Sequence, residues 1–104
     1  MAQKFTKVAE THEVPSGSMK VVELGRERVL LVNVDGQYYA VGEECTHAGG
    51  LLSEGYLEGH KVECPLHGSV FNLETGAPET PPADEGLPVY GVRVEGTSIL
   101  IAPS

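Results

Sequence analysis

The 104-residue sequence predicts a small all-β protein, and three observations support this fold class. Short runs rich in valine and leucine are separated by turn-forming dipeptides. The 13 glycines and seven prolines leave little room for long helices. A chain of this length suits a single domain with one modest core. We therefore expect one antiparallel β domain over residues 1–104, without internal repeats.

The first predicted hairpin lies in the N-terminal half. Lys20–Leu24 is a short strand candidate, and Arg28–Val34 is a stronger one because it is rich in Val and Leu. Asp35-Gly36 follows, and Gln37–Val41 then forms the next strand candidate. Asp-Gly between two such runs is a strong hairpin signal, since both turn positions favour a positive φ.

A second hairpin is predicted near the C-terminus, with strands over Val89–Val94 and Ser98–Ile101 around Glu95-Gly96. Between the two hairpins, His60–Glu63 and Val70–Asn72 read as short strands. The stretch 51–56 predicts at most a helical turn. The base strands then occupy about 1–42 and 73–104, and an insert occupies about 43–72.

Two short pairs of metal-ligand residues lie in that insert. They are Cys45-Thr46-His47 and Cys64-Pro65-Leu66-His67, with 16 residues between His47 and Cys64. Two thiolates and two imidazoles can hold one zinc ion tetrahedrally, or a [2Fe–2S] cluster with both cysteines on one iron. The single residue between the first two ligands favours the cluster, because zinc sites mostly space paired ligands more widely. A disulfide between the cysteines is the third alternative, and it leaves the histidines unexplained.

The two pairs and their flanks resemble the ligand loops of Rieske iron–sulfur proteins. Thr75-Gly76-x-Pro78 and Pro81-Pro82 resemble the turn and proline loop that cover the cluster in that family. The resemblance implies a small β-sandwich or barrel with a cluster-binding insert. It also implies one [2Fe–2S] cluster per chain, held by Cys45, His47, Cys64 and His67.

Departures from the pattern of quinol-oxidising Rieske proteins indicate which reduction potential to expect. Those relatives carry an extra disulfide between the ligand loops, where this chain has Gly50 and Leu66. They also place a serine and a tyrosine after the second histidine, where this chain has Ser69 and Phe71. We therefore expect a reduction potential near the low end of the Rieske range, about −150 mV. These features resemble the soluble Rieske-type ferredoxins that serve oxygenases.

The resemblance implies an electron carrier that is not itself an enzyme. Two ferric ions, two sulfides and two thiolates sum to zero charge, so one added electron meets less repulsion than in an all-cysteine cluster. The expected partners are a flavin- or iron–sulfur-containing reductase and a terminal, aromatic-ring hydroxylating oxygenase. The alternatives are a small accessory subunit of a nitrite reductase and a zinc-stabilised binding module.

The net charge of −8 argues against binding to nucleic acids or anionic membranes. It favours a partner with a basic docking surface, although the acidity also serves solubility. The N-terminus lacks the apolar stretch of a signal peptide, so we expect a cytoplasmic protein. We also expect a monomer.

The expected docking tip has an apolar rim and nearby steering acids. The rim residues are Gly49, Gly50, Leu66 and Pro81, and the acids are Glu43, Glu44, Glu54 and Glu79. His12 and His60 are expected to be solvent-exposed and not to bind metal.

Overall fold

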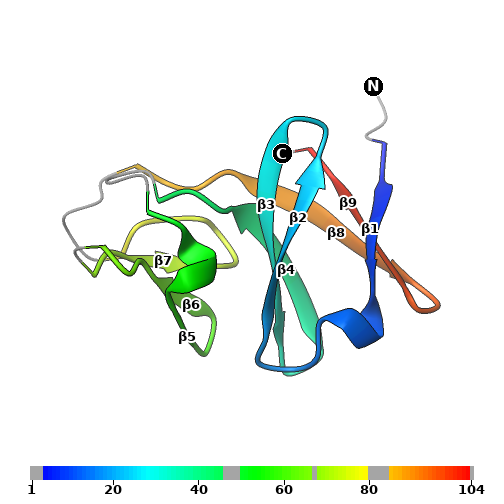
Figure 1. Cartoon of the computed structure of the whole chain (residues 1–104), viewed down its shortest axis with the longest axis horizontal. Helices are drawn as coiled ribbons and strands as arrows, with labels where there is room; N and C mark the ends of the chain where they lie inside the picture. The colour runs from blue at the N-terminus through cyan, green and yellow to red at the C-terminus, as the bar shows by residue number, and fades with distance from the viewer. Residues whose placement is uncertain (1–3, 46–49, 67, 80–84, 104) are drawn as a thin grey trace.

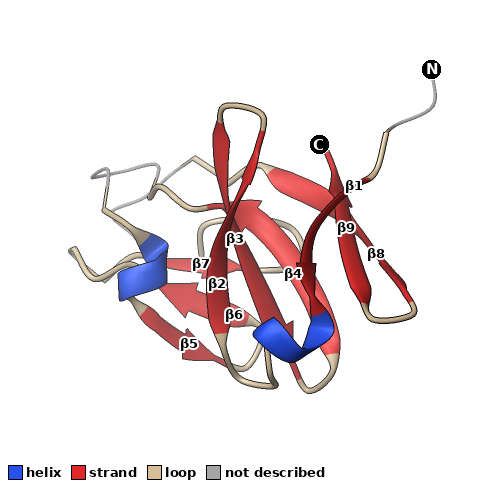
Figure 2. Ribbon diagram, turned by 45° about the vertical axis from the view of Figure 1, so that its right-hand side comes forward, coloured by secondary structure: helices blue, strands red, loops and turns tan. Residues whose placement is uncertain are grey.

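The computed structural model describes residues 4–45, 50–66, 68–79 and 85–103, and nearly all of its regular secondary structure is β. The larger sheet has the strand order β1-β9-β8-β4-β3-β2, and neighbouring strands pair antiparallel. Its strands are β1 Thr6–Glu10, β2 Met19–Leu24, β3 Glu27–Val34, β4 Gln37–Gly42, β8 Val89–Glu95 and β9 Ser98–Ala102. The edge strands β1 and β2 contact each other, so the sheet curls into a near-barrel (Figure 2).

A second, three-stranded antiparallel sheet has the order β5-β6-β7. Its strands are β5 Tyr56–Glu58, β6 Lys61–Glu63 and β7 Val70–Asn72. Two 3₁₀ turns complete the described elements, η1 Thr11–Glu13 and η2 Leu52–Glu54. Figure 1 shows the small sheet and η2 at the end of the molecule opposite β1 and β9. The all-β prediction is confirmed.

The predicted N-terminal hairpin is confirmed in register and in turn geometry. Asp35 and Gly36 have φ values of 51° and 92°, and Val34 pairs with Gln37 across them. At the C-terminal hairpin Glu95 pairs with Ser98, so the turn lies at 96–97, one residue later than predicted. Gly96 there has a φ of 61°, a conformation that glycine adopts without steric cost.

The sequence did not reveal β1 and β5. In β1 only Ala9 is buried, and a register shift between Lys7 and Ala9 interrupts its pairing with β9. β5 is only three residues long, and its outer residues Tyr56 and Glu58 are exposed. Neither segment carries the apolar alternation that marks a strand, because each is an edge strand that buries little.

Strand β3 separates two hydrophobic cores. Val29 and Leu31 pack into the near-barrel with residues of β1, β8 and β9. Leu30 and Val32 point the other way, into a core shared with the small sheet and both cysteines. Residues 29–34 are therefore buried on both faces, which explains why Val29–Val32 form an unbroken apolar run rather than an alternating pattern. The second core joins the insert to the base.

In the described ranges, no helix has the length and apolar character needed to cross a bilayer.

Candidate metal centre

The two cysteines begin two loops with the same closing hydrogen bond. The Cys45 N–H donates to the Gly50 carbonyl at 2.7 Å, and the Cys64 N–H donates to the Ser69 carbonyl at 2.7 Å. In each case the bond joins a cysteine to the residue five positions later. We call residues 45–50 the first ligand loop and residues 64–69 the second ligand loop. Both therefore present a cysteine from equivalent backbone positions.

The two cysteines are buried and are not joined by a disulfide. Their exposed fractions are 2% for Cys45 and 1% for Cys64. Burial raises the pKa of the Cys64 thiol, the hydrogen bond from the Leu66 amide opposes that rise, and the neighbouring Cys45 thiol adds to it. Two adjacent buried thiolates need a positive partner. A metal centre supplies it, because metals bind the thiolate form.

Gly50 leaves space beside the Cys64 sulfur because it has no Cβ. A Cβ added there would lie 3.1 Å from the Cys64 Sγ and 3.0 Å from the Leu66 Cγ. The Leu66 N–H also donates to the Cys64 Sγ at 3.4 Å. The two ligand loops thus approach each other closely around a pair of sulfurs. This arrangement fits a sulfur-rich metal group held between them.

His47 and His67 lie outside the described residues, so the structure does not place the two predicted imidazole ligands. Within 4–45, 50–66, 68–79 and 85–103, no group of three or more His, Cys, Asp or Glu side chains forms a metal site. His12 and His60 are exposed, as predicted. His60 packs edge-on against Tyr39, with ring centroids 5.6 Å apart.

The first ligand loop is attached to the large sheet at Glu43. This residue follows β4, and only 1% of it is exposed. Its carboxylate lies 3.1 Å from the Arg28 Nε and accepts a hydrogen bond from the Ser53 hydroxyl. The bridge between Glu44 and Leu51 continues the pairing toward the loop.

The second ligand loop extends from the hairpin of β6 and β7. Glu63 pairs with Val70 directly below the loop, and Phe71 is fully buried beneath it. Phe71 also forms a β-bridge with Pro78, which brings residues 77–79 alongside β7. Hairpin register and apolar packing therefore set this loop.

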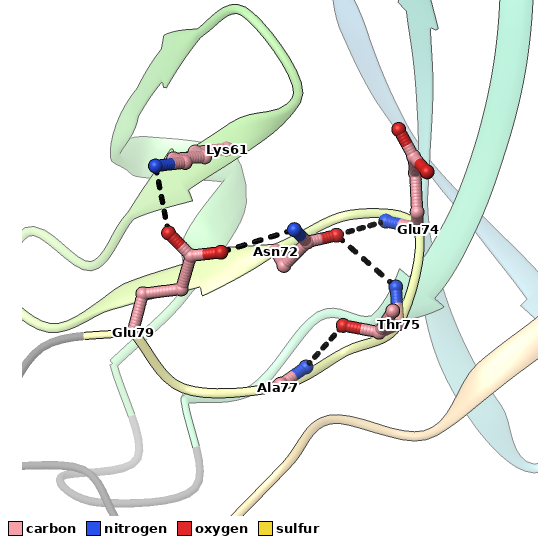
Figure 3. Close-up of polar contacts among 6 residues, drawn as sticks. All are labelled: Lys61, Asn72, Glu74, Thr75, Ala77 and Glu79. Carbon is pink, nitrogen blue, oxygen red and sulfur yellow. Dashed lines mark hydrogen bonds and ion pairs between the residues drawn. The ribbon is translucent and has the colours of Figure 1, made fainter.

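Residues 72–79 form a polar network around Asn72 (Figure 3). The Asn72 Oδ1 accepts from the Glu74 and Thr75 amides, and its amide nitrogen donates to Glu79 at 3.0 Å. Lys61 lies 2.7 Å from the other Glu79 oxygen. These two partners lower the Glu79 pKa, Lys61 most strongly. The predicted Thr75–Pro78 turn is thus tied to β6 and β7.

Two of the four predicted steering acids do not fit that role. Glu43 is buried in an ion pair, and Glu79 is held by Lys61 and Asn72, so neither presents a free charge. Glu44 and Glu54 are exposed, as steering requires. The sequence showed neither that Glu43 is buried nor that the exposed Glu79 is paired with Lys61.

The predicted apolar rim is described only in part. Leu66 is 46% exposed, whereas Gly50 is buried. Gly49 and Pro81 lie outside the described residues. Sequence reasoning also missed Arg28 and Ser53 as partners of Glu43. The acid two residues before Cys45 was the available signal, but its partners are distant in sequence.

Comparison with known proteins identifies relatives of this arrangement. Residues 4–91 match the Rieske [2Fe–2S] domain family. The biphenyl dioxygenase ferredoxin subunit of Pseudomonas sp. (strain KKS102) is 43% identical over 98 residues, which cover 93% of this chain and 90% of that protein.

Solved structures agree with this result. The ferredoxin of carbazole 1,9a-dioxygenase from Nocardioides aromaticivorans IC177 superposes with a TM-score of 0.92 at 31% identity, covering 97% of this chain and 99% of that one. A ferredoxin–oxygenase complex of carbazole 1,9a-dioxygenase matches with a TM-score of 0.89 at 34% identity, covering 97% and 94%. A protein from Mycobacterium tuberculosis that is described as a putative NADH-dependent nitrite reductase small subunit has a TM-score of 0.88 at 25% identity, covering 100% of this chain and 98% of that one.

Proposed function

This chain belongs to the Rieske [2Fe–2S] domain family, and from that premise we propose how it holds its cluster and which proteins it serves. It is the ferredoxin component of a dioxygenase system, an electron carrier rather than a catalyst. The bound [2Fe–2S] cluster supplies reversible one-electron chemistry. Everything else in the function depends on how the chain binds that cluster and presents it to partners.

We assign the ligands to Cys45, His47, Cys64 and His67. One observation carries this assignment: two buried, unpaired thiols lie together at the start of two loops closed by the same 2.7 Å hydrogen bond. A zinc-stabilised module would use the same residue types but would not transfer electrons. The insert at about 43–72 and the base strands form one domain in this proposal.

The proposed partners are a flavin- or iron–sulfur-containing reductase as donor and an aromatic-ring dioxygenase as acceptor. The relatives that transfer electrons to biphenyl and carbazole dioxygenases support this choice, since they match nearly the whole chain. The nitrite reductase subunit shares the fold at lower identity, so that assignment is less well supported. We further propose that the protein acts in the cytoplasm as a monomer.

The docking surface of this proposal is the ligand-loop tip around Leu66. This side chain is 46% exposed although it is apolar, and it follows Cys64 by two residues. Glu44 and Glu54 supply exposed negative charge on the neighbouring segment. Transient electron-transfer interfaces are small, often below ~1,200 Å², so one apolar contact and a few steering charges suffice.

A matched pair of variants tests this surface. Leu66→Glu and Val94→Glu each replace an apolar side chain that is 46% exposed, but Val94 lies on β8 of the large sheet. We expect Leu66→Glu to slow reduction of the oxygenase in stopped-flow assays while leaving the visible spectrum intact, and Val94→Glu to have little effect. Equal rates for the two variants would contradict the docking assignment.

Charge reversal tests the steering in the same assay. Glu44→Lys and Glu95→Lys change the net charge equally, and Glu95, on β8, forms an exposed pair with Arg93 at 3.5 Å. We expect Glu44→Lys alone to lower the association rate and to weaken its salt dependence. A salt-independent rate for the unmodified protein would refute electrostatic steering.

A further inference from the structure

The Glu43 side chain is unusual in this chain because it is an acid that is almost fully buried. Its exposed fraction is 1%, in a protein whose 15 acids outnumber its seven lysines and arginines and give a net charge of −8. Burying a carboxylate is costly unless ion pairs and hydrogen bonds replace its hydration. Glu43 therefore needs a structural or functional reason.

The backbone of Glu43 marks the point where the chain leaves the large sheet. Its N–H donates to the Arg28 carbonyl at 3.2 Å, which extends the pairing of β3 with β4 by one residue. Its carbonyl accepts from the Leu52 N–H at 2.9 Å, at the start of η2 and two residues after the first ligand loop. One residue thus contacts the sheet on one side and η2 on the other.

The side chain makes the same two connections. Its Oε1 lies 3.1 Å from the Arg28 Nε, and its Oε2 accepts from the Ser53 hydroxyl in η2. The Oε1 accepts no hydrogen bond from any group in the described part of the chain, so the ion pair is its principal stabilising contact. The carboxylate therefore ties β3 to η2 across the base of the loop.

We propose that Glu43 is a positioning residue for Cys45, held in place by Arg28 and Ser53. The inference rests on the ligand assignment of Cys45 made above. Alternate residues of an extended segment face opposite sides, so a one-residue slip between 43–45 and 50–52 would turn the Cys45 thiol away from Cys64. The buried carboxylate opposes that slip because it requires Arg28 and Ser53 in this register.

The test separates positioning from general stability. Glu43→Ala and Ser53→Ala remove the tie, and Ser53→Thr retains a hydroxyl. Tyr90→Phe is the matched control, because it removes the 2.8 Å hydrogen bond to Glu27 in the same hollow, of about 440 Å³, that Glu43 and Cys45 line. That bond ties β8 to β3 and does not involve the loop. Each cluster-loaded variant is challenged with excess iron chelator below its unfolding temperature.

The readouts are the half-life of the visible absorbance, the thermal midpoint by circular dichroism and the reduction potential. We expect Glu43→Ala and Ser53→Ala to shorten the half-life about tenfold or more, as for other groups that orient metal ligands. We expect Ser53→Thr to restore most of it, and Tyr90→Phe to change it less than twofold. The potential should shift in Glu43→Ala but not in Tyr90→Phe.

The proposal is overturned if Ser53→Ala loses the cluster no faster than Tyr90→Phe, or if Ser53→Thr gives no rescue. Should Glu43→Ala fail to fold, the three remaining variants still decide the question. Failure of the ligand assignment itself has a different signature. In that case Cys45→Ser assembles and retains the cluster normally, whatever the Glu43 variants do.

Discussion

The two ligand loops are closed in the same way but anchored differently. In both, a buried cysteine donates its N–H to the carbonyl five residues later at 2.7 Å. Below the first loop, a buried carboxylate pairs with an arginine of the large sheet. Below the second, strand register and the buried Phe71 ring serve instead. A buried ion pair thus contributes to the support of the first loop, whereas strand pairing and aromatic packing support the second.

Removing either thiol should have the largest effect on cluster content, and the effect should be the same for both loops. Cys45→Ser and Cys64→Ser each delete one of two buried sulfurs, and thiolates are required to hold such clusters. We expect neither variant to retain two irons and two sulfides per chain, measured by iron and acid-labile sulfide analysis. Full occupancy in either variant would show that its loop does not supply a thiolate.

Cavities under the two loops should lower stability by similar amounts. Leu52 lies below the first loop and Phe71 below the second, and both side chains are fully buried. Leu52→Ala should cost about 2–5 kcal/mol and Phe71→Ala about 3–5 kcal/mol of unfolding free energy. Denaturant titration of the cluster-loaded protein measures this. A loss below about 1 kcal/mol at either site would mean that its loop is not supported by this core.

Alanine substitutions at Gly50 and Gly68 should affect different properties, the iron content at Gly50 and the stability at Gly68. Gly50→Ala places a Cβ 3.1 Å from the Cys64 Sγ, so it should reduce the iron content per chain. Gly68 has a φ of 74° but more room, because an added Cβ would lie 3.7 Å from a Glu63 carboxylate oxygen. Gly68→Ala should therefore cost about 1–2 kcal/mol of stability through backbone strain. Unchanged iron content in Gly50→Ala would contradict the crowded interface.

The smallest expected effect is a change in reduction potential, and it arises from residues in and below the second ligand loop. Ser69 is fully buried beside Cys64, and we expect its hydroxyl to stabilise negative charge on the cluster sulfurs. Ser69→Ala should then lower the reduction potential by about 20–60 mV, the equivalent of one ordinary hydrogen bond. Phe71→Tyr should raise it if the new hydroxyl reaches a sulfur. Voltammetry measures the potentials of both variants. An unchanged potential in Ser69→Ala would show that the Ser69 hydroxyl does not stabilise the reduced cluster.

Patterns that are local in sequence predicted much of the fold. Asp35-Gly36 marked its hairpin because the turn demands positive φ at both positions. Cys45 and Cys64 were identified from ligand spacing, and both are buried together. The edge strands β1 and β5 were not predicted because they bury too few residues to show an alternating apolar pattern.

The anchoring of the first loop could not be predicted from sequence. Glu43, Arg28 and Ser53 meet only after β3, β4 and η2 have packed, so no spacing rule links them. The same limit applies to Glu79, which lies beyond the end of β7, whereas its partner Lys61 is on β6. Sequence gives the number of charges, whereas folding decides which are paired.

Nitrogen hyperfine spectroscopy can show whether the two loops hold one cluster through two thiolates and two imidazoles. The protein is labelled with ¹⁵N-histidine, reduced, and studied by electron–nuclear double resonance. The account predicts couplings to two imidazole nitrogens, one lost in His47→Cys and the other in His67→Cys. A reduced cluster with no histidine coupling, or with couplings that persist in both variants, would contradict it.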